Sequence, residues 1–330
     1  MFFLLSSPKN LLIKSLIFLS PLWLFFFFNL LTSPFPNSTL IYLFHFSLYS
    51  LTAKILVNQY RNRLSLPLVF SLAFQFLLGL IQVFRSKAGT FYWLGERNLS
   101  LSTLGVAKTS FFNFFTLRAY GTFSHPNALA GWSILVLIIL FSFSSRRLVR
   151  LTSLVLTLGI LGITQSRLAL FAFLVWFLIT NPLNFRPLKF WLTPIFTCLF
   201  FWQFFSFRPL AIQQRLGLIL TSFKLSLRWP WFGTGLGSSL AAYTKIFPPQ
   251  LYLQPDHNSL TLFLSQTGLF GLFSLYFLFR SFISRYQLKP HFFLSFFLPS
   301  LSLLLFDHYL LTSSQGLFII NLFFYEFISD

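Results

Sequence analysis

The chain has 330 residues, of which 56% are hydrophobic and 9% are charged, and phenylalanine alone occurs 51 times. No soluble domain can bury so many apolar side chains, so the composition excludes a soluble globular protein. The formal charge of +19 would suggest DNA binding in a soluble chain. In a membrane protein the cations are divided among loops. Their expected partners are then anionic lipids and pyrophosphate groups, and not nucleic acid.

Apolar runs long enough to cross a bilayer recur along the whole chain, because a spanning helix needs about 20 mostly apolar residues. The sequence predicts an all-α integral membrane protein with about ten transmembrane helices in one polytopic domain over residues 1–330. The expected helices cover residues 11–31, 39–57, 64–84, 126–144, 151–165, 168–180, 190–206, 259–279, 291–306 and 312–328. The fifth and sixth are two helices with Arg167 at their shared tip, because one long helix would place a lone cation near mid-bilayer.

Basic residues gather in the short loops that this arrangement places on one side of the membrane. They are Lys9, Lys14, Arg61, Arg63, Arg146, Arg147, Arg150, Arg186, Lys189, Arg280, Arg285 and Lys289. Short loops rich in Lys and Arg stay in the cytoplasm, so we expect a multi-pass plasma-membrane protein with both termini cytoplasmic. Two long loops, about 85–125 and 207–258, then face outward. The single cysteine, Cys198, lies inside an expected span and excludes a disulfide or a thiolate metal cluster.

The second outer loop contains an amphipathic segment followed by a glycine-rich turn. Apolar residues follow helical spacing from Leu216 to Leu227, which predicts a helix lying on the bilayer surface. The turn GTGLGSS at residues 233–239 is no nucleotide P-loop, because no Lys-Ser or Lys-Thr closes it. A plain tight turn is the favoured interpretation, and a phosphate held by its backbone amides, around Gly235 and Gly237, is the alternative.

Polar clusters stand at the ends of several expected spans, and each has a structural interpretation as well as a functional one. Arg167 can anchor a helix end in the headgroups, and Arg215 can be a surface-helix cation. His257 with Asn258 can be a helix cap, and His125 before Pro126 can be a helix entrance. The functional interpretation depends on their convergence, because the topology puts one set on the same outer face. That set is Arg118, His125, Arg167, Arg215, Asp256, His257, Asp307 and His308.

Arginine and histidine on one face suit the departure of a pyrophosphate with a hydroxyl group as nucleophile. Guanidinium forks match phosphate oxygens and keep their charge, and an imidazole can accept the proton of the attacking hydroxyl. The outward acids are Glu96, Asp256 and Asp307, with no paired carboxylate motif to hold a hard cation. We therefore expect metal-independent chemistry without a cofactor.

The ordered set of motifs resembles the superfamily of O-antigen ligases and Wzy-type polymerases. The motifs are SHPN before a span, SR at a helix tip, an arginine in a surface helix, GTGLG, HNSLTLFLSQTGLFGLF and FDHYLLTSSQG, covering roughly Tyr92 to the C-terminus. The resemblance implies an inverting membrane glycosyltransferase with a GT-C-like architecture. Such an enzyme transfers a glycan from an undecaprenyl-pyrophosphate carrier to an acceptor hydroxyl of a glycan, lipid or protein on the outer face of the membrane.

The resemblance also implies roles for particular residues. Arg167 and Arg215 match the arginines that are expected to hold the lipid pyrophosphate, and His257 matches the histidine expected to activate the acceptor. Asn258 is expected to help fix the acceptor. Further candidates for substrate contact are Arg118, Tyr120, His125, Asn127, Gly235, Gly237, Asp256, Asp307 and His308. Gln266 stands where similar proteins often carry Glu, so no catalytic carboxylate is expected there.

Several alternatives share these features. Ligases, polymerases and protein O-oligosaccharyltransferases have the same motifs, and the sequence does not separate them. A flippase or transporter for the same lipid-linked sugar would instead show charges deep in the spans, paired broken helices and an internal repeat. A non-catalytic scaffold in polysaccharide assembly would tolerate the loss of His257.

Overall fold

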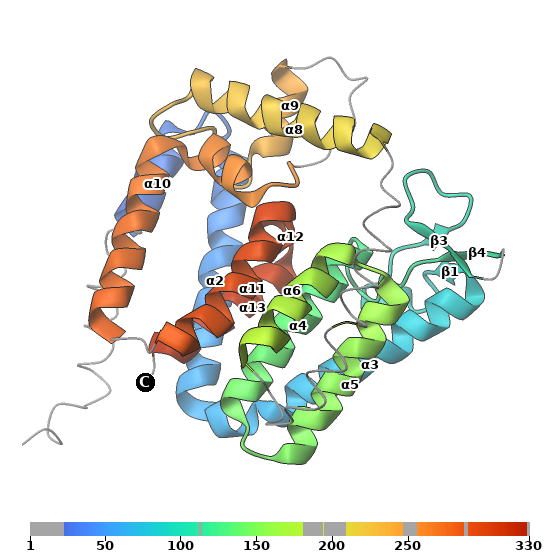
Figure 1. The fold of residues 1–330 in the computed structure, drawn as a ribbon. Coiled ribbons are helices and arrows are strands. Elements are labelled where there is room, and N and C mark those ends of the chain that lie inside the picture. The colour runs from blue at the N-terminus through green and yellow to red at the C-terminus, as the bar shows by residue number, and fades with distance from the viewer. Residues whose placement is uncertain are drawn as a thin grey trace, which may run out of the picture. The chain divides into compact units, whose positions relative to one another are not determined.

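The computed structural model describes residues 23–111, 114–180, 194, 209–246, 256–286 and 290–328. These residues are mostly helical (Figure 1), and helices occupy the expected spans that fall among them. The expected helix at 190–206, apart from one residue, and the first part of the helix at 11–31 lie outside the described residues. Four described helices are long and apolar enough to cross a membrane: α2 (Pro36–Tyr60), α3 (Ser65–Arg85), α5 (Arg147–Thr164) and α10 (Ser259–Tyr286). The described part of the chain therefore fits a helical membrane protein.

The chain divides into two compact units, each assembled from two separate stretches of sequence. Unit 1 comprises Met1–Phe46 and Leu210–Leu288, and unit 2 comprises Ser47–Pro209 and Lys289–Asp330. The division falls inside α2, so this helix contributes to both. Each unit is described by itself.

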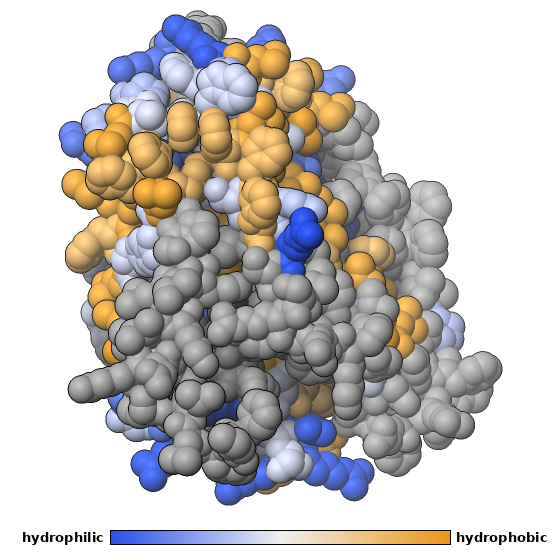
Figure 2. Space-filling model, turned by 90° about the vertical axis from the view of Figure 1, so that its left-hand side faces the viewer, coloured by the Kyte–Doolittle hydropathy of each residue, from blue (hydrophilic) through white to orange (hydrophobic). Residues whose placement is uncertain are grey.

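The described residues of unit 1 form the first part of α2 and four other helices. The other helices are Trp23–Thr32, α8 (Pro209–Arg228), α9 (Ser239–Ile246) and α10. Phe25, Phe26 and Leu236 form one apolar cluster of this unit. Apolar side chains gather over this part of the surface in the space-filling view (Figure 2). On α10, Phe273, Tyr276 and other large side chains are exposed. This exposed apolar surface is what a helix in contact with lipid requires.

Unit 2 is built around α4 (Pro126–Phe143), which is buried at every residue from Gly131 to Leu140. A helix that is apolar on all sides, as the run SILVLIIL is, must be enclosed by other elements. The helices in contact with α4 are α3, α5, α6 (Arg167–Thr180), α11 (Pro290–Phe306), α12 (Tyr309–Thr312) and α13 (Ser314–Ile328). A short 3-10 turn, η1 (Arg61–Arg63), connects α2 with α3.

The predicted break between the fifth and sixth helices is confirmed. Gln165 adopts a left-handed backbone with φ of 48° and ends α5, and α6 begins at Arg167. Then α6 runs beside α4, since the rings of Trp176 and Phe141 lie 5.1 Å apart.

The first long loop contains short strands that the sequence did not predict. β1 (Lys87–Ala88) pairs antiparallel with β2 (Leu99–Ser100), and β3 (Lys108–Phe111) pairs antiparallel with β4 (Phe114–Leu117). A 3-10 turn, η2 (Tyr92–Leu94), lies between β1 and β2. The strands are too short to produce a clear alternating pattern, which is why the sequence shows only a loop.

Candidate functional site

The polar cluster of unit 2 begins at the first turn of α4. His125 has an extended backbone and caps the helix, because its Nδ1 atom accepts a hydrogen bond of 3.2 Å from the backbone amide of Asn127. Pro126 occupies the first helical position, where its missing N–H is harmless. The structural interpretation of this histidine as a helix entrance is therefore confirmed. The cap leaves the Asn127 side chain available for contacts to other elements.

Arg118 connects this first turn to the end of α5. Its Nε atom donates to the carbonyl oxygen of Thr164 at 2.6 Å, and its Nη2 atom donates to Asn127 Oδ1 at 3.1 Å. The pKa of Arg118 is lowered to about 10, mainly by burial and in smaller part by the positive charge of Arg167, while Tyr120 acts in the opposite direction. The guanidinium is still a cation at neutral pH. Two arginine side chains thus lie close together.

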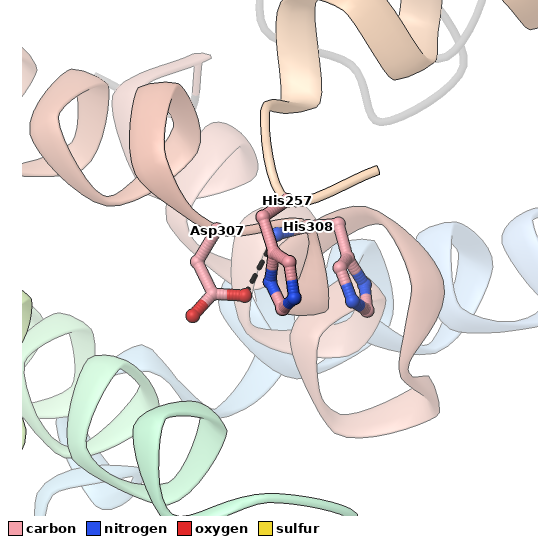
Figure 3. Close-up of side chains that lie close together, drawn as sticks. All are labelled: His257, Asp307 and His308. Carbon is pink, nitrogen blue, oxygen red and sulfur yellow. Dashed lines mark hydrogen bonds between the residues drawn. The ribbon is translucent and has the colours of Figure 1, made fainter. Parts of the chain in front are cut away.

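Asp307 and His308 lie at the junction of α11 and α12. Asp307 Oδ1 accepts from the backbone amide of His308 at 2.9 Å (Figure 3), and Oδ2 accepts from Asn127 Nδ2 at 3.4 Å. His308 Nδ1 lies 2.7 Å from the Thr312 hydroxyl oxygen, which fixes the imidazole on α12. Figure 3 also draws His257, which belongs to unit 1 and is treated with that unit. Arg118, Asn127 and Asp307 therefore form a continuous chain of hydrogen-bonding groups within unit 2.

Aromatic rings pack beside this chain of polar groups. The ring of His125 stacks on Tyr309, with centroids 5.3 Å apart, and meets Tyr120 edge-on at 6.2 Å. Tyr120 itself is buried, and its hydroxyl oxygen accepts from the backbone amide of Ala107 at 2.8 Å. Tyr120 therefore has a structural role, and it positions the His125 ring. Tyr309 is absent from the residues predicted from the sequence, although it directly follows the Asp307–His308 pair.

A small pocket joins the first turns of α4 and α6 to the α11–α12 junction. It has room for about one water molecule. Its lining residues are Asn127, Ala128, Gly131, Ser166, Leu168, Ala169, Leu303, Asp307, Tyr309 and Leu310. Helix N-termini carry partial positive charge, so the two helix ends and the nearby arginines favour an anion in this part of unit 2.

In unit 1, the polar residues before α10 form a helix cap. Asn258 Oδ1 accepts from the backbone amides of Leu260 at 2.9 Å and Thr261 at 3.1 Å, which is the geometry of an N-cap. Asp256 is buried, and its carboxylate accepts from the Asn258 amide at 2.9 Å and from the Thr261 hydroxyl. His257 lies half-buried between these two capping residues. The cap thus fixes the backbone on both sides of the imidazole.

Arg215 lies on α8, the helix predicted as amphipathic. The arginine is exposed, as are Leu216 and Leu220 of the apolar face, whereas Ser222 is buried. The Ser222 hydroxyl lies 2.6 Å from that of Tyr243 on α9. The helix therefore packs through a partly polar face and presents apolar side chains outward, as a helix on a bilayer surface does.

The glycine-rich turn has a packing role in the structure. Every backbone amide from Gly233 to Ser238 donates to an acceptor within unit 1. In chain order the acceptors are the carbonyl oxygens of Trp229, Ser265 and Gln266, the side-chain oxygens of Asn29 and Gln266, and the carbonyl oxygen of Gly235. The amides of Gly235 and Gly237 are therefore occupied, which fits the favoured interpretation of a tight turn, while a binding role for the two glycines stays a prediction.

The turn packs against a break in α10 at Gly268. This residue has φ of 63° and ψ of −164°, a conformation that only glycine adopts readily. The backbone amide of Leu269, which follows the break, donates to the carbonyl oxygen of Pro230 at 2.8 Å. Asn29 is a further residue that was not predicted from the sequence. It could have been noticed there, because it is the lone amide side chain in the apolar run FFFFNLL.

No protein-family model, curated protein or solved structure matches this chain.

Proposed function

We propose that this protein is a membrane glycosyltransferase that transfers a glycan from an undecaprenyl-pyrophosphate carrier to an acceptor hydroxyl. The observation that carries this proposal is a pair of nearby arginines: Arg118, which donates a hydrogen bond to Asn127 in the first turn of α4, and Arg167, the first residue of α6. Two like charges repel each other, and helix N-termini add further positive potential, so an anionic ligand stabilises the arrangement. In a membrane protein, a lipid that carries a pyrophosphate is an anion of the required kind.

In the proposed reaction the arginines bind the pyrophosphate and neutralise the charge that develops as it leaves. From the resemblance, Arg167 and Arg215 are the proposed pyrophosphate ligands, and Arg118, which is hydrogen-bonded to Asn127, supports Arg167. His257 accepts the proton of the acceptor hydroxyl as its oxygen attacks the anomeric carbon. The C–O bond to the pyrophosphate breaks at the same carbon, which inverts its configuration. The resemblance to O-antigen ligases supports these assignments, and no metal ion takes part.

The finer architecture is also part of this proposal. About ten transmembrane helices in a GT-C-like arrangement would place both termini in the cytoplasm and the site at the outer face. A ligase is the preferred activity, and a Wzy-type polymerase or protein O-oligosaccharyltransferase would use the same groups with another acceptor.

The break in α10 favours a second candidate function, a flippase or transporter for the lipid-linked sugar. Broken helices in transporters expose backbone groups to a substrate pathway. Here the neighbouring amides of Leu269 and Phe270 donate to carbonyl oxygens of Pro230 and Trp231, so the break is closed by protein. We therefore prefer the transferase.

Transfer by purified protein in lipid tests the proposal directly. The protein is supplied with undecaprenyl-pyrophosphate glycan, candidate acceptors and a chelator, and Arg167→Gln and His257→Asn are compared with the wild type. Removing a general base lowers rates by about 100-fold or more, so we expect transfer to survive chelation and to fall by that factor in His257→Asn. Arg167→Gln should mainly weaken binding of the lipid donor.

The matched controls are Arg146→Gln and His45→Asn, which change exposed residues outside the proposed site. Both should retain transfer. Unchanged transfer in Arg167→Gln and His257→Asn would refute the site, and movement of the lipid-linked glycan across the bilayer without transfer would identify a flippase.

A further inference from the structure

Residues 85–120, which begin at the last residue of α3, form a small folded module with its own apolar core. Ala88, Leu117 and Tyr120 are buried together, and Leu99 and Val106 pack against them. The β1–β2 and β3–β4 pairs provide its backbone hydrogen bonds. The described part of this module is therefore ordered, and the side chains outside its core have defined positions.

Glu96 is the single acidic residue of the module, and its carboxylate is directed inward. It is 3% exposed. Its Oε1 atom accepts from Gln82 Nε2 on α3 at 2.7 Å, and its Oε2 atom accepts from the backbone amides of Gly89 at 3.2 Å and Phe91 at 2.5 Å. These bonds fix the loop containing Tyr92 to the last turns of α3, a helix long and apolar enough to cross the membrane. The loop must therefore lie where that helix leaves the bilayer.

Large apolar side chains of the module point away from its core. Tyr92 is 77% exposed, Trp93 78%, Leu104 98% and Phe115 68%. Their exposure to water would be unfavourable, whereas tyrosine and tryptophan are enriched at the boundary between lipid tails and headgroups. The surface of the module is also positively charged, because its exposed charged side chains are Arg85, Lys87, Arg97 and Lys108.

We propose that this module is a membrane anchor, which inserts Trp93 and Leu104 into the bilayer interface and binds anionic phospholipid headgroups through its cations. Apolar and aromatic side chains next to basic ones are the combination that binds anionic membrane surfaces. A sugar-binding surface would need acceptor groups beside the exposed rings, but the carboxylate of Glu96 is turned into the protein. The anchor is independent of the proposed transferase activity.

Nitroxide labelling tests the insertion. Cys198 is replaced by serine, and single cysteines are placed at Trp93, at Leu104 and, as a control, at the exposed Ser102 of the same module. The labelled proteins are reconstituted in nanodiscs of phosphatidylcholine and phosphatidylglycerol, and accessibility to oxygen and to a water-soluble nickel chelate is measured by electron paramagnetic resonance. We expect labels at 93 and 104 to be shielded from nickel and open to oxygen, relative to the label at 102.

The amount of phosphatidylglycerol that stays bound to the purified protein tests whether the cations of the module bind anionic headgroups. Each cation near a membrane surface strengthens binding of anionic lipid by roughly five-fold, so Lys87→Gln with Arg97→Gln should weaken phosphatidylglycerol retention by about 25-fold. Arg146→Gln with Arg147→Gln removes two exposed cations outside the module and should have a smaller effect. The bound lipid is counted by mass spectrometry of the purified protein.

Three results would overturn the anchor. Labels at 93 and 104 that are as accessible to nickel as the label at 102 would exclude insertion. Equal lipid loss in both double variants would exclude a specific headgroup site. Labels that become shielded only when a polysaccharide is added would identify a glycan-binding surface instead.

Discussion

The glycine-rich turn of unit 1 and the polar cluster of unit 2 are both dense in hydrogen-bonding groups. In the turn, each amide from Gly233 to Ser238 donates to an oxygen of the same unit. In the cluster, Arg118 and Asn127 bond to each other, yet two arginines still lie close together beside two helix N-termini. The polar groups of the turn are satisfied within the turn and its neighbours, whereas the cluster brings two cations and the Asp307 carboxylate together around Asn127.

This difference suggests different roles for the two regions: the turn fixes backbone geometry, and the cluster binds a ligand. Glycines at positive φ let the turn approach α10 closely, and the approach itself uses the amides that a phosphate would need. A partly buried guanidinium next to another cation is unfavourable, so its presence favours a functional role over a packing role. We therefore expect changes in the turn to act on stability and changes in the cluster to act on substrate binding.

Gly235→Ala should have the largest effect on stability. A Cβ atom at Gly235 would lie 2.2 Å from the hydroxyl oxygens of Ser33 and Thr39, and its φ of +98° is unfavourable for alanine. Backbone strain and overpacking together predict a loss of about 3 kcal/mol or more. Thermal unfolding in detergent measures this loss, together with the yield of folded protein.

Gly217→Ala is the matched control, because a Cβ atom at this helical position meets nothing within 4 Å. It should raise stability by up to about 1 kcal/mol, the difference in helix propensity. A Gly235→Ala protein as stable as the wild type would contradict the tight packing of the turn and would favour the phosphate-cradle interpretation.

Arg118→Gln should affect both stability and substrate binding. Loss of its hydrogen bonds to Thr164 and Asn127 predicts a decrease of about 1.5–3 kcal/mol in the free energy of unfolding. Loss of its charge should also weaken the binding of an undecaprenyl-pyrophosphate glycan. Donor affinity measured in nanodiscs, with unfolding followed in parallel, separates the two effects.

Arg150 provides a control with the same kind of bonds. It donates to the carbonyl oxygens of Ser144 at 2.6 Å and Phe141 at 3.2 Å, at the C-terminal end of α4. Arg150→Gln should therefore lose similar stability but keep donor affinity. Equal affinity losses in the two variants would show that Arg118 has only a structural role.

The sequence predicted most of the helices and little of the local geometry. The apolar runs and the break before Arg167 could be located because their patterns are local in the chain. The short strands around Glu96 and the role of Asn29 depend on partners that are distant in sequence. For example, Asn29 Oδ1 accepts from the amide of Leu236 at 2.9 Å.

The candidate site shows the same limit. The sequence identified Arg118, Asn127 and Asp307 as polar residues near helix ends, and the structure joins them within unit 2. It missed Tyr309, because stacking on His125 depends on tertiary packing. It did not predict that the amide of Gly235 donates to the carbonyl oxygen of Gln266 on α10.

Tyr243 in unit 1 should produce a pH-dependent stability. Burial raises the pKa of its phenol to about 12, with the neighbouring Asp256 charge acting in the same direction and the hydrogen bond with Ser222 opposing it. Below pH 10 the phenol is protonated in both the folded and unfolded chains. Between pH 10 and 12 only the unfolded chain loses the proton, so folding loses about 2 kcal/mol. Tyr243→Phe lacks this loss.

The measurement compares the unfolding of wild type and Tyr243→Phe at pH 8, 10, 11 and 12, because the difference between the two proteins cancels other titrating groups. The advantage of the wild type should shrink as the pH rises. A constant difference would show that the phenol is not buried in the folded protein.

Asn258 should show the smallest effect, and it tests whether a helix cap also binds substrate. Asn258→Ala removes the acceptor for the amides of Leu260 and Thr261 and should cost about 1 kcal/mol. Asn258→Asp keeps this acceptor and should retain stability, but it replaces the amide group that an acceptor sugar would contact. Unfolding and transfer are measured for both variants. If Asn258→Asp retains full transfer as well as stability, Asn258 belongs with the glycine-rich turn as a purely structural element, and only His257 of this segment remains a candidate for the chemistry.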